Sequence, residues 1–113
     1  MARVAAFVPD LLFGSNVLGM LRAAGHEAAL VSDPAAGAGC DVLVVDLTAE
    51  AAARIALVRG AAAELVGTRT LAFYSHVEAD VRREAQAAGL DLVVPRSRMA
   101  REGAALVTRL ASG

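Results

Sequence analysis

The sequence predicts an α/β sandwich in which a five-stranded parallel sheet is covered by helices on both faces. Three observations support this prediction. Five short segments are almost continuously apolar rather than alternating, which is typical of parallel strands buried on both faces. Segments with helical periodicity lie between most of these strands, and three of the helical segments are followed by glycine. The length of 113 residues suits a single domain that spans residues 1–113.

The five strand candidates follow one another at regular intervals. They are RVAAFV (3–8), EAALVS (27–32), DVLVVD (41–46), RTLAFY (69–74) and DLVVP (91–95). Their alternation with helices predicts a doubly wound sheet. Five strands in a chain of this length favour the flavodoxin-like strand order 2-1-3-4-5.

Apolar residues recur at helical spacing in four of the connecting or terminal segments. These predicted helices cover residues 15–24, 49–66, 77–88 and 98–110. Gly25, Gly67 and Gly89 follow the first three helices. Glycine adopts the left-handed backbone conformation that ends many helices, so we expect it to do so at all three positions.

One connection is too short for the pattern. Only DPAAGAGC, residues 33–40, lies between the second and third strands, whereas a parallel crossover normally needs about a dozen residues. We therefore expect the second helix to be reduced or missing. The sheet face left partly bare predicts a protein partner or a homodimer that covers it.

Composition excludes several classes of protein. With 57% hydrophobic residues the chain is too apolar for disorder, and its net charge of −1 does not favour nucleic-acid binding. No apolar run approaches the roughly 20 residues that span a membrane, and no signal-peptide pattern is present, so we expect a cytoplasmic protein. Cys40 is the single cysteine, which excludes an internal disulfide.

Polar side chains stand at the ends of four predicted strands. Asp10, Asp46, Ser75 and Arg96 follow or end the first, third, fourth and fifth strands. Ligands of such sheets bind at the carboxyl ends of the strands, so these residues are the candidate site. Beside them, Leu11, Leu12 and Phe13 form either an apolar lip at this edge or the first turn of a helix packed on the core.

Each polar residue also has a structural interpretation. Asp10 could cap the helix that follows it, and Asp46 could be stabilised by the amino end of the next helix. Ser75 and Glu78 form the pattern of a capping box. Arg96 could be solvated or could pair with Asp46.

The same residues resemble those of the response-regulator receiver (CheY-like) domain. In that family an aspartate after the third strand accepts a phosphoryl group, and Asp46 occupies this position. Ser75 matches the hydroxyl residue after the fourth strand. Residues 84–96, EAQAAGLDLVVPR, resemble the family's run from its fourth helix through its fifth strand. The resemblance implies that Asp10 and Asp46 bind Mg²⁺ weakly and that Arg96 contacts the phosphoryl group.

The chain departs from the family at two of these positions. The acidic pair after the first strand is reduced to Pro9-Asp10, and Pro95-Arg96 replaces the family's Lys-Pro. All 11 basic residues of the chain are arginine, and the planar guanidinium fork does not reproduce the point charge of lysine.

Three functions therefore remain open. The first is a degenerate receiver that acts in signalling or protein interaction without a standard phosphorylation cycle. The second is an active phosphoacceptor that uses Asp46 with Mg²⁺. The third is a flavodoxin-like domain that binds a nucleotide or another small anion, with residues 10–16 closing over it. We do not expect an enzyme, because no nucleophile and base stand at a recognisable spacing.

Overall fold

The computed structural model describes all residues, 1–113, and contains one parallel sheet in the order β2-β1-β3-β4-β5. The strands are β1 (Arg3–Phe7), β2 (Glu27–Leu30), β3 (Val42–Asp46), β4 (Arg69–Tyr74) and β5 (Leu92–Pro95). The predicted fold class and strand order are therefore confirmed, and every predicted strand is present with small differences at its ends.

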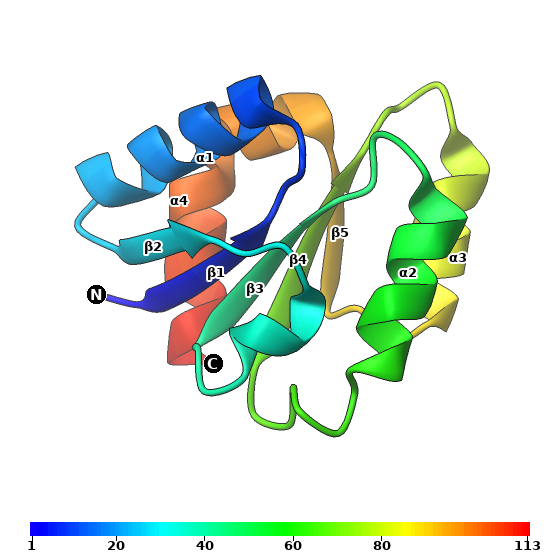
Figure 1. The fold of residues 1–113 in the computed structure, drawn as a ribbon. Helices are drawn as coiled ribbons and strands as arrows, with labels where there is room; N and C mark the ends of the chain where they lie inside the picture. Colours follow the sequence, from blue (N-terminus) through cyan, green and yellow to red (C-terminus); the bar gives the residue numbers. More distant parts are fainter.

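Helices cover both faces of the sheet (Figure 1). They are α1 (Leu11–Ala23), the 3₁₀ turn η1 (Pro34–Gly37), α2 (Ala51–Gly60), α3 (Ala79–Ala87) and α4 (Arg96–Ser112). Helices α1 and α4 pack together on one face, whereas α2, α3 and η1 lie on the other.

The central strand β3 shows why its sequence is continuously apolar. Val42 and Val44 belong to the core beneath α1 and α4, and Leu43 and Val45 belong to the core beneath α2 and α3. All five residues of β3 are buried. Because both faces of this strand are covered, it has no solvent-facing side on which polar residues could alternate.

All four helices differ from the prediction at their ends, and α4 covers Arg96–Ser112 rather than residues 98–110. Helix α1 begins at Leu11 rather than at residue 15, because the Asp10 side chain caps it. Helix α2 ends at Gly60 rather than at residue 66, and turns continue the chain to Gly67. Helix α3 begins at Ala79 rather than at residue 77.

The predicted glycine stops are confirmed by the backbone. Gly25, Gly67 and Gly89 have φ values of 90°, 86° and 90°, in the left-handed region that glycine adopts at little cost. Gly25 and Gly89 follow α1 and α3 closely, whereas Gly67 closes the turns after α2.

The connection between β2 and β3 is short, as predicted. The turn η1 covers only four residues and is capped by Asp33, whose carboxylate accepts a hydrogen bond from the Ala35 N–H. It leaves Ala29 of β2 exposed. A groove of about 220 Å³ runs beside this strand, and its lining includes Arg3, Glu27, Ala29, Val31, Ala36 and Cys40.

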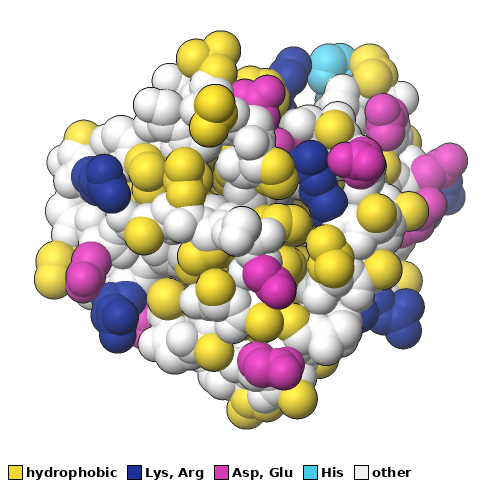
Figure 2. Space-filling view, viewed as in Figure 1, with side chains coloured by type: hydrophobic (Ala, Val, Ile, Leu, Met, Phe, Trp, Pro, Cys, Tyr) yellow, Lys and Arg dark blue, Asp and Glu magenta, His cyan; other side chains and the backbone are white.

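The molecular surface carries charges of both signs. In the view of Figure 2, acidic and basic side chains are interspersed, and hydrophobic side chains reach the surface in the middle of the face. This mixed distribution agrees with the net charge of −1. No helix is both long enough and apolar enough to cross a membrane.

Candidate functional site

Asp46 ends β3 at the carboxyl edge of the sheet, where the sequence predicts it. Asp46 is only 1% exposed to solvent. The carboxylate oxygen Oδ1 accepts hydrogen bonds from the Thr48 N–H at 2.8 Å and from the Thr48 hydroxyl at 2.6 Å. Thr48 therefore folds the chain after β3 back over the carboxylate and covers one of its oxygens.

Arg54, in the first turn of α2, supplies the positive charge at this carboxylate. Its Nη1 lies 3.5 Å from Asp46 Oδ2 and donates a hydrogen bond of 3.0 Å to the Asp46 carbonyl oxygen. The Arg54 side chain is 12% exposed, and its Nη2 lies 3.9 Å from Glu50, which is largely exposed. The buried carboxylate thus has an internal counter-ion.

The sequence analysis missed Arg54. The sequence feature that could have indicated it is the position of Arg54 near the start of a predicted helix, four residues after Glu50 and eight after Asp46. The alternative that paired Asp46 with Arg96 is wrong, because Arg54 is the only basic residue within 4.0 Å of the Asp46 carboxylate.

Asp10 acts as a helix cap, which is one of its two sequence interpretations. Its Oδ1 accepts a hydrogen bond of 2.9 Å from the Phe13 N–H, and the residue is exposed. Such a bond satisfies one of the four N–H groups that have no partner within a helix.

The two carboxylates that the sequence predicts to bind Mg²⁺ weakly, Asp10 and Asp46, are both engaged in contacts within the protein. No three histidine, cysteine or acidic residues come together as a metal-binding group. Mg²⁺ requires nearly octahedral oxygen ligands at about 2.0–2.1 Å. At Asp46, Thr48 donates two hydrogen bonds to Oδ1 and Arg54 Nη1 lies 3.5 Å from Oδ2, so a metal ion would compete with both residues.

Ser75 and Arg96 line one cavity, and Asp46 is not among the residues that line it. Both line a cavity between α1, the end of β4 and the start of α4. The predicted capping box at Ser75 is wrong, because α3 begins after Glu78 without a side-chain cap. Ser75 contributes its carbonyl oxygen instead, which accepts a hydrogen bond of 2.9 Å from the Glu78 N–H.

Arg96 lies over an aromatic ring rather than beside an acid. Its guanidinium carbon is 5.3 Å from the centroid of the Phe13 ring, which is within the range of a cation–π contact. Arg96 has no carboxylate within 4.0 Å and no side-chain hydrogen bond.

The predicted apolar lip divides into two parts. Phe13 is partly buried and lines the cavity, whereas Leu11 and Leu12 are 84% and 69% exposed and do not line it. All three residues form the first turn of α1. The first-turn interpretation is thus confirmed for Phe13, which packs against the core, whereas the lip stays a prediction.

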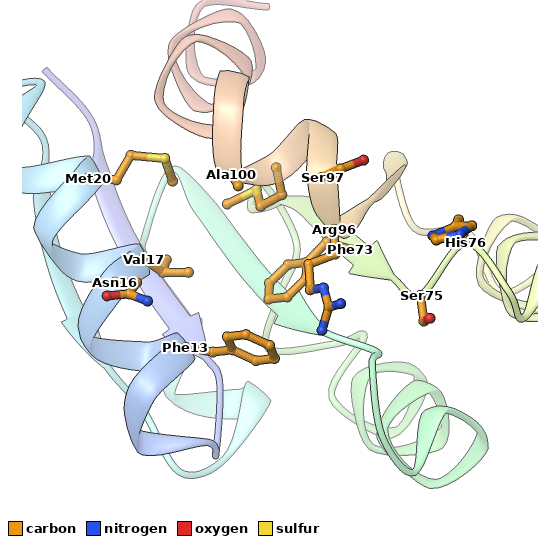
Figure 3. Close-up of a pocket in the computed structure, with 11 residues that line it drawn as sticks. Phe13, Asn16, Val17, Met20, Phe73, Ser75, His76, Arg96, Ser97 and Ala100 are labelled. Atoms are coloured by element: carbon orange, nitrogen blue, oxygen red, sulfur yellow. The ribbon is translucent and has the colours of Figure 1, made fainter.

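The cavity has a volume of about 410 Å³ (Figure 3). It is lined by Phe13, Asn16, Val17, Met20, Phe73, Ser75, His76, Arg96, Ser97, Met99 and Ala100. In Figure 3 the side chains of Phe13 and Arg96 approach each other between the two helices, whereas His76 lies on the side remote from α1.

Comparison with solved structures shows that the same fold occurs in receiver domains. The receiver domain of Francisella response regulator 1452 has 14% sequence identity and a TM-score of 0.81, with 99% of this chain and 98% of that chain covered. The BeF3-activated DrrB receiver domain has 14% identity and a TM-score of 0.81, with coverage of 100% and 99%.

A third similar structure has a different description. It is a putative pilus assembly-related protein from Burkholderia pseudomallei, with 16% identity, a TM-score of 0.82 and coverage of 99% of this chain and 90% of that chain. No protein-family model matches the sequence, and no relative is found among curated proteins. The resemblance to receiver domains is confirmed for the fold.

Proposed function

We propose that this chain, which has the receiver fold, is a degenerate receiver that acts in signalling through protein interaction. It has no standard phosphorylation cycle and no enzymatic activity of its own. The proposal goes beyond the fold, because one fold carries many functions and the site must decide between them.

The observation that supports the proposal is the buried ion pair between Asp46 and Arg54. A phosphoacceptor must be reached by a phosphodonor, whereas Asp46 is 1% exposed. Arg54 brings a permanent cation to 3.5 Å from Asp46 Oδ2. Because this charge is already balanced, a divalent cation would have to displace Arg54 and the hydrogen bonds of Thr48.

An NMR titration of amide resonances tests this proposal. The wild-type protein is titrated with Mg²⁺ to millimolar concentration and then with beryllofluoride, a mimic of a phosphoryl group. We expect no saturable shifts at Asp46, Leu47 or Thr48. Arg54→Gln removes the cation, so shifts in that variant alone would identify Arg54 as the block. Arg59→Gln, an exposed arginine on the same helix, is the matched control.

The opposite result would support an active phosphoacceptor. Asp46 stands at the carboxyl end of β3 and Ser75 follows β4, which is the placement that this alternative needs. Saturable Mg²⁺ and beryllofluoride shifts at Asp46 in the wild-type protein would refute the degenerate receiver.

We also propose that the face left bare by η1 is covered by a second copy of the chain. Ala29 is exposed there, and Arg3 lies 3.9 Å from Glu27 at the edge of the same groove. A twofold interface needs a surface that complements itself. Adjacent charges of opposite sign satisfy this need, because Arg3 of each copy can face Glu27 of the other.

Light scattering at micromolar concentration measures the oligomeric state. We expect the mass of a dimer for the wild-type protein and of a monomer for Ala29→Arg, which places a bulky charge in the groove. The matched control is Ala53→Arg on α2, also exposed. A monomeric wild-type protein would contradict this part of the proposal.

A further inference from the structure

The cavity beside Arg96 is separate from the Asp46 carboxylate. It lies between α1 and the first turns of α4, and Asp46, Thr48 and Arg54 are not among its lining residues. Its volume of about 410 Å³ falls within the range of roughly 300–1,000 Å³ that is typical of small-molecule sites. The cavity therefore has room for a ligand without any change at the Asp46 ion pair.

The walls of this cavity are apolar and adaptable. Val17, Phe73 and Met99 are buried core residues whose side chains also reach the cavity. A Cβ atom on Gly103 would lie 2.6 Å from the Met20 methyl group and 2.9 Å from the Met99 methyl group. The missing side chain at Gly103 thus accommodates both methionines, and unbranched methionines can adjust to the shape of a ligand.

Three polar side chains of the cavity, Ser75, Arg96 and Ser97, have no hydrogen-bond or ion-pair partner within the protein. Arg96 has no acidic partner within 4.0 Å. The hydroxyl groups of Ser75 and Ser97 make no hydrogen bond within the protein, and no side chain caps the start of α4. The cavity thus combines an apolar interior with one unpaired cation and two free hydroxyl groups.

We propose that this cavity binds a small organic anion with an apolar body, such as an aromatic or aliphatic carboxylate. The apolar body lies among Val17, Met20, Phe73 and Met99. The carboxylate lies at the Arg96 guanidinium, which can donate two parallel hydrogen bonds to it. This binding site does not depend on whether Asp46 accepts a phosphoryl group.

The apolar walls select against a bare inorganic anion. Six of the 11 residues that line the cavity are hydrophobic, so a fully hydrated ion would lose solvation that Arg96 alone cannot replace. An organic anion places only its charged group at Arg96 and its apolar surface against the walls. We therefore expect it to bind more tightly than phosphate.

An NMR titration with three probes tests the site. The probes are 2-naphthoate, its neutral analogue 2-naphthamide and inorganic phosphate. We expect saturable amide shifts with 2-naphthoate at Phe13, Val17, Phe73 and Ser97, at least tenfold weaker binding of 2-naphthamide, and no saturation with phosphate. The amide resonances of Asp46 and Thr48 report on the Asp46 site instead. Failure of the cavity proposal can therefore be distinguished from failure of the degenerate-receiver proposal.

Three variants separate charge from shape. Arg96→Gln should weaken 2-naphthoate binding by about 10- to 100-fold, the range for losing a charged hydrogen-bond partner, and should leave 2-naphthamide nearly unchanged. Arg101→Gln is the matched control, because this exposed arginine of α4 does not line the cavity. Ala100→Phe should abolish binding of both probes by filling the cavity from an exposed lining position.

Several outcomes would overturn the proposal. They are no saturable 2-naphthoate binding at millimolar concentration, equal affinity for the acid and its amide, or equal losses in Arg96→Gln and Arg101→Gln. Shifts confined to the exposed leucines Leu11 and Leu12 would indicate adsorption to the surface and would also overturn it.

Discussion

Removal of the Arg54 side chain tests the buried ion pair directly. Arg54→Met retains the apolar part of the side chain and removes its positive charge. The Asp46 carboxylate, which is 1% exposed in the wild-type structure, then has no cation beside it. Breaking a buried pair by removing one partner costs about 3–5 kcal/mol. Asp46 keeps two hydrogen bonds from Thr48, which places the expected loss at the lower end, about 3 kcal/mol.

Urea unfolding followed by circular dichroism measures this loss. For a small domain the unfolding free energy falls by about 1–3 kcal/mol per molar urea. With a slope of about 2 kcal/mol per molar, the midpoint of Arg54→Met should lie about 1.5 M below that of the wild-type protein. Arg59→Met on the exposed side of α2 should change it by less than about 0.3 M, because surface substitutions cost about 0.5 kcal/mol or less.

A double-mutant cycle with Asp46→Asn identifies the cause. Asparagine is neutral, so Arg54→Met leaves no unpaired buried charge in that background. The substitution should then lower the unfolding free energy by about 1 kcal/mol, the contribution of the lost hydrogen bond to the carbonyl oxygen of residue 46. The coupling energy is then about 2 kcal/mol. Equal costs of Arg54→Met in both backgrounds, or a loss below about 1 kcal/mol, would refute the buried-pair interpretation and indicate a surface-type ion pair.

Two further substitutions test contacts that position the elements. His26 is buried, and its Nδ1 accepts a hydrogen bond of 3.1 Å from the Ala2 N–H. His26→Ala should lower the unfolding free energy by about 2–3 kcal/mol, because it leaves that N–H unpaired. The same substitution at the exposed His76 should change the unfolding free energy little in the same urea assay. Asp10→Ala removes the cap of α1 and should cost about 1 kcal/mol in thermal or urea unfolding. Asp10→Asn should retain most of that stability, and equal losses in the two variants would show that charge rather than capping is responsible.

Apart from β2, the strands were predictable because their sequence records burial on both faces. All five residues of β3 are buried, which leaves a continuous apolar run that few other structures produce. The short connection at 33–40 was equally visible, because eight residues cannot hold a full crossover helix. Local sequence therefore predicted the sheet and the reduced helix.

The site was less predictable because it depends on side chains that meet across elements. The order of the strands places Asp46 and Ser75 at one edge of the sheet, but it does not predict which arginine contacts the Asp46 carboxylate. The sequence analysis considered Arg96, which follows β5, whereas Arg54 reaches the carboxylate from the first turn of α2. The cavity likewise depends on how closely α1 and α4 approach at Gly103, which no local pattern records.

The ion pair at Asp46 also bears on how many conformational states the chain populates. A switch responds to a signal only when the signal binds one of its states more strongly than the other. Here Arg54 connects the first turn of α2 to the end of β3 through its hydrogen bond to the Asp46 carbonyl oxygen and its ion pair with the carboxylate. In the degenerate receiver that we propose, the Asp46 charge is already balanced within the chain, so the surface around α2 would not vary with phosphorylation. Its signalling output would then depend on the amount of protein.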